Sequence, residues 1–186
     1  MQPGQWKIKR AALQLLDGKV LAYPTDATWA LGCDPENETA TLRLLAITER
    51  PPEQGLILLA GSVAQIEHLL DGLSSKQRRA IVASWPGPAR WLVPDVNDEI
   101  PAWIKGASGN VALAVSAHPL VQALCLEFGG PVVSISACPG TDVAARSALQ
   151  VVKHFGKDID GVLHGKPGGL TPPDSIIDAR SGRVVP

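Results

Sequence analysis

Apolar residues recur along the chain with two different spacings. A spacing of three to four residues is typical of a helix with one buried face, and short continuous apolar runs are typical of buried strands. The first spacing predicts helices over residues 6–17, 39–48, 119–128 and 144–154. The second predicts strands over residues 20–23, 56–60, 91–93, 111–115 and 132–136, with shorter ones near 162 and 176 and an edge strand in the last residues. Because strands and helices alternate, the pattern indicates an α/β fold: a twisted mixed open sheet with helices packed against it.

Three polar signals predict where helices begin. Ser62 is followed three residues later by Gln65, and Ser74 is followed in the same way by Gln77. This spacing is that of a capping box, in which the two side chains satisfy backbone N–H groups at a helix start. The pair at 118–119, His-Pro, puts proline at its favoured first helical position. We therefore expect helices to begin at all three places.

Composition narrows the class of protein. The chain has 186 residues, of which 45% are apolar and 19% are charged, so we expect one folded domain over residues 1–186 rather than a disordered chain. No apolar run approaches the roughly 20 residues that span a bilayer, and the first ten residues lack the apolar segment of a secretory signal. The three cysteines, Cys33, Cys125 and Cys138, are odd in number and widely spaced, as reduced thiols in a cytoplasm would be. We expect a cytoplasmic protein without a membrane partner.

Charge and common motifs exclude several function classes. The net charge is −1, from 17 basic and 18 acidic residues, so strong bulk attraction to nucleic acid is not expected, although a local basic groove is compatible with it. The sequence contains no HExxH, GxSxG, GxxxxGK[ST] or GxGxxG motif. We therefore expect no metal site made by the protein, no serine hydrolase elbow, and neither a Walker nor a Rossmann nucleotide loop.

Two threonines stand where α/β sheets commonly bind ligands. The segment 23–35, YPTDATWALGCDP, reads as a strand that runs into a small polar loop. Thr25 and Thr28 follow the strand end, so their hydroxyl groups are candidate ligand contacts. The alternative is a strand-ending turn stabilised by Asp26.

Two serines alternate on a buried strand. Ser134 and Ser136 lie two residues apart in the predicted strand 132–136, so both point to the same face. Two hydroxyl groups on one face can bind a phosphate or a carboxylate. The alternative is a pair of core hydroxyl groups with internal hydrogen bonds.

These segments, with ITERPPEQGL at 47–56, SWPGP at 84–88 and AVSAHPLV at 114–121, resemble the YrdC/TsaC-type threonylcarbamoyl-AMP synthases in the same order over about residues 20–178. The short length resembles the single-domain bacterial form. The resemblance implies a YrdC-like sheet with a concave, electropositive ligand groove. It also implies a nucleotidyltransferase that condenses L-threonine, bicarbonate and ATP, with Mg2+ accompanying the ATP, into threonylcarbamoyl-AMP and pyrophosphate. A separate transferase complex then modifies adenosine 37 of tRNA, so tRNA or double-stranded RNA and that complex are candidate partners.

The resemblance also implies the site residues. The family uses a Lys-x-Arg on the loop after the second helix and a Ser-x-Asn on the serine strand. Arg50 and Ser136 are retained and are the expected catalytic residues, whereas Thr48 replaces the lysine and Cys138 replaces the asparagine. The expected substrate-binding residues are Thr25, Thr28, Thr48, Arg90, Ser134 and Cys138. Fixed cations suit this chemistry because the threonine carbamate and the α-phosphate that it attacks are both anionic.

Other positions depart from the family pattern. Gln54 and Ala114 replace basic residues, Asp174 replaces a serine, and Arg90 replaces a threonine. Together with Thr48, three cationic positions of the family are therefore neutral here, and Arg90 is a cation that the family pattern lacks. Two alternatives to the synthase stay open. One is a catalytically weakened member that binds RNA, a nucleotide or a protein partner without turnover, and the other is a different adenylate- or carbamoyl-using enzyme on the same scaffold.

Overall fold

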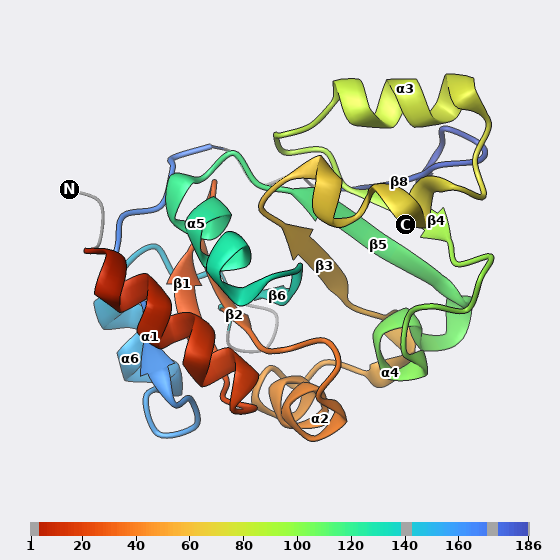
Figure 1. The fold of residues 1–186 in the computed structure, drawn as a ribbon. Coiled ribbons are helices and arrows are strands. Elements are labelled where there is room, and N and C mark those ends of the chain that lie inside the picture. Colours follow the sequence, from red (N-terminus) through yellow and green to blue (C-terminus); the bar gives the residue numbers. More distant parts are fainter. Residues whose placement is uncertain (1–3, 139–142, 171–174, 186) are drawn as a thin grey trace.

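The computed structural model describes residues 4–138, 143–170 and 175–185, and within these ranges nine strands form one mixed sheet (Figure 1). The strands are β1 Leu21–Pro24, β2 Trp29–Gly32, β3 Ile57–Ala60, β4 Trp91–Pro94, β5 Asn110–Val115, β6 Val132–Ser136, β7 Gly161–Val162, β8 Ile176–Asp178 and β9 Val184–Val185. Their order across the sheet is β7-β1-β2-β6-β3-β5-β4-β8-β9. The pairs β1–β7, β3–β5 and β4–β8 are parallel and the others are antiparallel. The predicted mixed sheet is confirmed.

Helices cover the sheet. The α-helices of the described residues are α1 Gln5–Leu16, α2 Glu38–Ile47, α3 Ser75–Ala83, α4 Ala102–Lys105, α5 Pro119–Phe128 and α6 Ala148–Phe155. Short 3-10 turns occupy residues 52–54, 63–65, 67–70 and 106–108. None of the helices in the described ranges is both long and apolar enough to cross a membrane.

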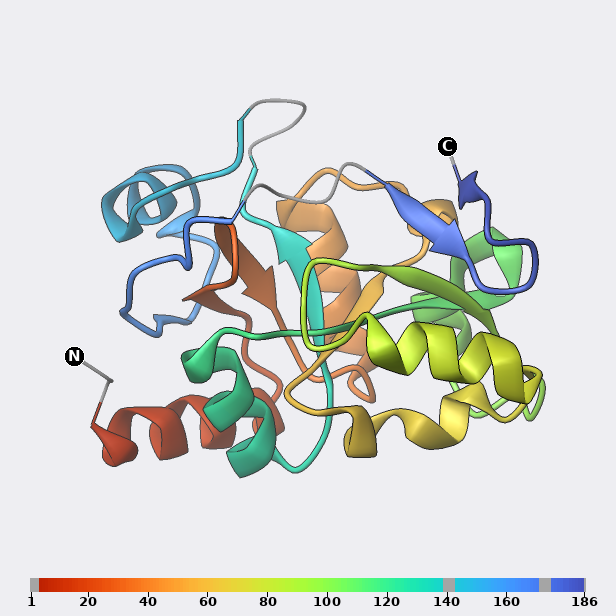
Figure 2. The ribbon, with the colours of Figure 1, turned by 90° about the horizontal axis from the view of Figure 1, so that it is seen from above.

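Neighbouring side chains along a strand belong to two different apolar clusters. In β1, Leu21 and Tyr23 belong to a cluster with residues of α1 and α5, whereas Ala22 belongs to a second cluster with residues of α2, α3 and α6. This division follows from the period of two along a strand, which sends neighbouring side chains to opposite faces. Helices α1 and α5 pack side by side over the first cluster (Figures 1 and 2).

Local signals predict several helix starts correctly. The Ser74 hydroxyl accepts a hydrogen bond from the Gln77 backbone N–H, and the Gln77 side chain accepts one from the Ser74 N–H at 2.9 Å, so the capping box is confirmed. Helix α5 begins at Pro119, as predicted. By contrast, α6 begins at Ala148 rather than at residue 144, with Ser147 as its N-cap.

The helix predicted to begin at Ser62 is wrong. Two 3-10 turns replace it, because the Gln65 side chain is used elsewhere. Its Oε1 accepts from the Gly61 N–H at 2.8 Å, and its Nε2 donates to the Cys125 carbonyl at 2.9 Å. A tertiary contact between the end of β3 and α5 therefore overrides the local capping signal.

Strand β2 is missing from the sequence prediction, which treated these residues as loop. The backbone N–H of Thr25 donates to the Thr28 carbonyl at 2.8 Å, and this turn folds β2 back against β1. All four β2 residues are buried, so the strand lacks the alternation of apolar and polar residues that marks a half-exposed strand.

Candidate active site

One cavity gathers six of the eight predicted site residues. They are Thr25, Thr28, Arg50, Arg90, Ser134 and Ser136. Small and apolar side chains from the central strands complete the lining, including Ala30, Ile57, Leu59 and Ala114. The cavity therefore joins segments that lie more than a hundred residues apart in the chain.

The hydroxyl groups enter the cavity from two neighbouring elements. The Thr25 hydroxyl donates to the Thr28 carbonyl at 2.9 Å, so Thr25 fixes the shape of the turn between β1 and β2. In the β2–β6 ladder Ala30 pairs with Ser136, which brings this turn beside the serine strand. Ser134 and Ser136 share one face of β6, as predicted, and both line the cavity.

The end of α2 positions Arg50. Glu49 has a φ of 51°, in the left-handed region. Its N–H donates to the Ala46 carbonyl at 3.3 Å, and the Arg50 N–H donates to the Leu45 carbonyl at 3.0 Å. These two bonds form the Schellman arrangement that closes a helix. The arginine stands directly beyond this closure, so its backbone is held by the helix end.

Arg90 enters from the loop that precedes β4. The N–H of Gly87 in this loop donates to the Val115 carbonyl at 3.0 Å, and the Arg90 carbonyl accepts from the Ile177 N–H at 2.9 Å. The β4–β5 register pairs Trp91 with Leu113, so Arg90 lies beside the end of β5. The loop is thus attached to β5 through Gly87 and to β8 through Arg90.

The two arginines make the cavity electropositive. Burial lowers the pKa of Arg90, and the charge of Arg50 lowers it further, as expected for like charges that share one cavity. Within residues 4–138, 143–170 and 175–185, neither guanidinium group has an ion pair or a side-chain hydrogen bond. Two guanidinium groups that have no ion pair with any described residue can bind an anion with several oxygens.

One carboxylate also lines the cavity. Asp26 Oδ2 accepts a hydrogen bond from the Ser116 hydroxyl at 2.5 Å, and Oδ1 accepts one from the Ala117 N–H at 3.0 Å. Both oxygens are therefore engaged by the protein. These contacts attach the β1–β2 turn to the residues that follow β5.

Thr48 lies outside the cavity lining. Its side chain is buried, and its hydroxyl donates to the Leu44 carbonyl at 2.8 Å inside α2. The structure thus separates Thr48 from Thr25, Thr28, Arg90 and Ser134, because its hydroxyl is bonded within α2. Gln54 is exposed at the end of the 3-10 turn 52–54.

Cys138 follows β6 and is half-buried, with its N–H donating to the Ser136 carbonyl at 2.8 Å. It is not among the described residues that line the cavity. Asp174 lies outside the described residues. Leu170 was missed by sequence reasoning, although it lines the cavity. The nearby Gly168 is the signal, because a Cβ atom there would lie 2.7 Å from the backbone oxygen of Asp26.

Comparisons with known proteins identify the family of this chain. The family model for Sua5, YciO and YrdC, described as telomere recombination, matches residues 14–185. A Stutzerimonas stutzeri protein named threonylcarbamoyl-AMP synthase is 47% identical over 182 residues, which cover 98% of this chain and 97% of that protein. A Halorhodospira halophila protein of the same name is 45% identical, over 97% of this chain and 94% of that protein.

Solved structures share the fold. P. abyssi Sua5 in complex with L-threonine has a TM-score of 0.87 and 26% identity, and the match covers 96% of this chain but 52% of the other, so this chain spans about half the length of that protein. E. coli YciO has a TM-score of 0.87 at 24% identity, over 99% of this chain and 89% of that one. The predicted YrdC-like architecture is confirmed, and this chain belongs to the Sua5/YciO/YrdC family.

Proposed function

We propose that this protein is a threonylcarbamoyl-AMP synthase, which condenses L-threonine, bicarbonate and ATP into threonylcarbamoyl-AMP and pyrophosphate. The observation that carries the proposal is that two arginines, Arg50 and Arg90, share one cavity with Ser134 and Ser136. Relatives that are 42–47% identical over nearly the whole chain carry this name.

The site chemistry suits the reaction. The carbamate of threonine and the α-phosphate of ATP repel each other, and fixed positive charge offsets that repulsion most in the transition state. Arg50 and Arg90 supply this charge without an acidic partner among the described residues. Hydroxyl groups of Ser136, Ser134 and Thr28 orient the oxygens of the two reactants. In these roles Arg50 and Ser136 are catalytic residues, and the others bind substrate.

Magnesium is expected to arrive with ATP, with the phosphates as its main ligands. Across the described ranges no group of three or more His, Cys, Asp or Glu side chains could hold a metal ion. Asp26 is the one carboxylate among the described lining residues, and its oxygens already accept two hydrogen bonds. Among the described residues, therefore, Asp26 is the one lining carboxylate that such a nucleotide-bound cation could approach.

The proposed product is an activated carbamate, so a second enzyme must consume it. We place the protein in the cytoplasm, upstream of a transferase complex that modifies adenosine 37 of tRNA. Contact with tRNA or double-stranded RNA is a weaker partner proposal, because the chain carries a net charge of −1.

A second candidate function is nucleotide binding without turnover. It is favoured by the side chains that stand where the family has cations: Thr48 is turned into α2, Gln54 is neutral, and Ala114 lines the cavity without a charge. Under this alternative ATP binds but neither pyrophosphate nor threonylcarbamoyl-AMP is formed.

A direct assay separates the two functions. Purified protein is incubated with ATP, Mg2+, bicarbonate and L-threonine, and pyrophosphate and threonylcarbamoyl-AMP are measured. We expect both products, and we expect Arg50→Ala and Arg90→Ala each to lower kcat/KM by about ten- to a hundredfold, since each removes a charge-assisted contact. Arg79→Ala, on the exposed face of α3, is the matched control and keeps wild-type activity. ATP binding without products supports the second candidate, and absence of both products and binding overturns the proposal.

A further inference from the structure

A chain segment lies on the β1–β2 turn beside the cavity. Residues 164–170, here called the crossing segment, follow β7, which lies at one edge of the sheet next to β1. The next strand along the chain, β8, lies near the opposite edge, next to β4 (Figure 2). Leu170, at the end of the crossing segment, lines the cavity. The position of this segment therefore helps to define one wall of the proposed substrate site.

Two backbone hydrogen bonds lay the crossing segment on the β1–β2 turn. The Gly168 N–H donates to the Thr25 carbonyl at 2.9 Å, and the Leu170 N–H donates to the Asp26 carbonyl at 2.9 Å. The contact is close: a Cβ atom at position 168 would lie 2.7 Å from the Asp26 carbonyl oxygen. A side chain at position 168 would push the two segments apart.

The residues that join β5 to α5 hold both of these segments. Ser116 and Ala117 bind the Asp26 carboxylate of the turn. The next residue, His118, is 2.9 Å from the Lys166 carbonyl oxygen through its Nε2 atom. Ser116 and Ala117 therefore hold the turn, and the next residue, His118, holds the crossing segment.

The hydrogen-bond partners of His118 determine which of its ring nitrogens carries the proton. The Lys166 carbonyl can only accept, so Nε2 carries a proton and donates it. The Leu120 N–H can only donate, and it lies 3.3 Å from Nδ1, which therefore accepts. Nδ1 thus caps α5, and Nε2 holds the crossing segment. The two nitrogens have separate roles.

We propose that His118 is a positioning residue that holds the crossing segment against the β1–β2 turn and so sets the Leu170 wall of the cavity. The consequence for substrate affinity rests on the proposed function, whereas the consequence for the crossing segment does not. His118 touches neither substrate nor reacting atoms in this role; it acts through the Lys166 carbonyl.

Two substitutions separate the roles of the ring nitrogens. Asparagine can place an acceptor where Nδ1 lies but cannot reach Lys166, and glutamine can place a donor where Nε2 lies but is a poor cap. In the ligand-free protein, we expect His118→Asn to increase the NMR amide exchange rates of Gly168 and Leu170 about tenfold, with a melting temperature close to wild type. We expect His118→Gln to leave these two exchange rates near wild type and to lower the melting temperature by about 3 °C.

Kinetics and a second variant complete the test. We expect His118→Asn to raise KM for ATP about fivefold with kcat changed less than about twofold, because one wall moves and the charged groups stay. Gly168→Ala, which displaces the same segment without touching the cap, is expected to reproduce both the exchange and the KM effects. Equal exchange rates in His118→Asn and wild type, or equal increases in the asparagine and glutamine variants, would overturn the proposal. Because exchange is measured without ligand, it decides the positioning role even if the chain proves not to be a synthase.

Discussion

Arg50 and Arg90 face one cavity, and this arrangement is unfavourable in the free protein. Burial and the neighbouring positive charge both lower the pKa of Arg90, which means that its charged form is less stable there than in water. Groups held in this way, in a cavity and without a described acidic partner, mark functional sites more often than structural ones. At the residue scale, the repulsion that costs stability is the feature that suits the site to an anion.

Two buried cysteines give a second prediction at the residue scale. Burial raises the pKa of Cys33 to about 12 and that of Cys125 to about 12. Since the thiolate is the reactive form, both residues are expected to stay unmodified when the folded protein is treated with iodoacetamide at pH 8. Peptide mapping by mass spectrometry measures the modification, and the same treatment in denaturant is the control in which both residues react. Modification of Cys33 in the folded protein would show that burial does not keep its thiol unreactive.

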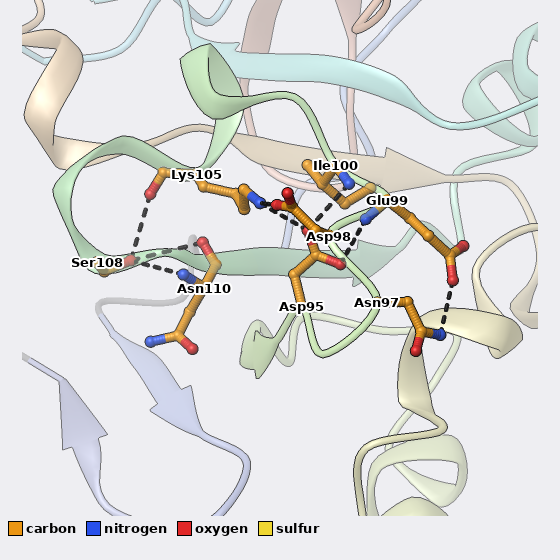
Figure 3. A network of polar contacts seen from close by, with 8 residues as sticks. All are labelled: Asp95, Asn97, Asp98, Glu99, Ile100, Lys105, Ser108 and Asn110. Atoms are coloured by element: carbon orange, nitrogen blue, oxygen red, sulfur yellow. Dashed lines mark hydrogen bonds and ion pairs between the residues drawn. The ribbon is translucent and has the colours of Figure 1, made fainter.

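At the scale of elements, one acidic side chain organises the connection between β4 and β5 (Figure 3). The Asp95 side chain is 2% exposed and accepts hydrogen bonds from the N–H groups of Glu99 and Ile100 at 3.0 and 2.9 Å. Lys105, 10% exposed, donates to Asp95 at 2.9 Å and also bonds Asp98. The carboxylate replaces the backbone partners that an irregular loop lacks.

This loop makes the stability of the protein depend on pH. Burial by itself raises the pKa of Asp95, but the hydrogen bonds from Lys105, Ile100 and Glu99 outweigh it, and the pKa lies below its ordinary value of 3.8. A lowered folded-state pKa means that the ionised group stabilises the fold above pH 3.8, and that this contribution is lost as the pH falls through the folded-state pKa. Asp95→Asn is therefore expected to lower the free energy of unfolding by about 2 kcal/mol at pH 7, with a difference from wild type that shrinks in acid.

Urea unfolding at several pH values measures this difference. Asp98→Asn is the matched control, because Asp98 shares Lys105 but its side chain is 89% exposed, and we expect little change there. A pH-independent loss in Asp95→Asn, or an equal loss in the control, would show that the buried carboxylate is not the cause.

Sequence reasoning succeeded for elements whose signals are local. Strand β3 and residues 111–115 of β5 are continuous apolar runs, and α5 begins at a His-Pro pair, so pattern and chemistry agree within each element. It failed for β2 and for the segment after Ser62. After Ser62, a contact with the distant helix α5 decides the backbone, and such contacts leave no local periodicity. Strand β2 is only four residues long and pairs with β1 through a tight turn and with the distant strand β6.

At the scale of the whole molecule, the cavity joins strands that are far apart in sequence. The β1–β2 turn, the end of α2, the start of β4 and strand β6 each contribute polar groups. A nucleotide bound there would link these elements in the folded state and have no site in the unfolded chain. By mass action, ATP with Mg2+ at a hundred times Kd is expected to raise the melting temperature by about 5 to 10 °C.

Differential scanning calorimetry measures this shift. The double variant Arg50→Ala with Arg90→Ala is expected to lose most of it, because both cations of the cavity are then absent. Arg79→Ala again serves as the control with the full shift. A shift of equal size in the double variant would place the nucleotide elsewhere on the protein.

The sequence by itself determined the α/β class, most strands and helices, and the family, and it offered as candidates six residues that the structure then places in one cavity. These features are local patterns or short motifs, and burial of one face imposes them wherever the segment lies. Tertiary structure alone decided that Arg90 enters the cavity, that Thr48 is turned away into α2, and that Leu170 forms a wall held through His118. The reason is geometric. Strand register and chain connections determine which side chains converge, and neither property can be predicted from the residues of one segment.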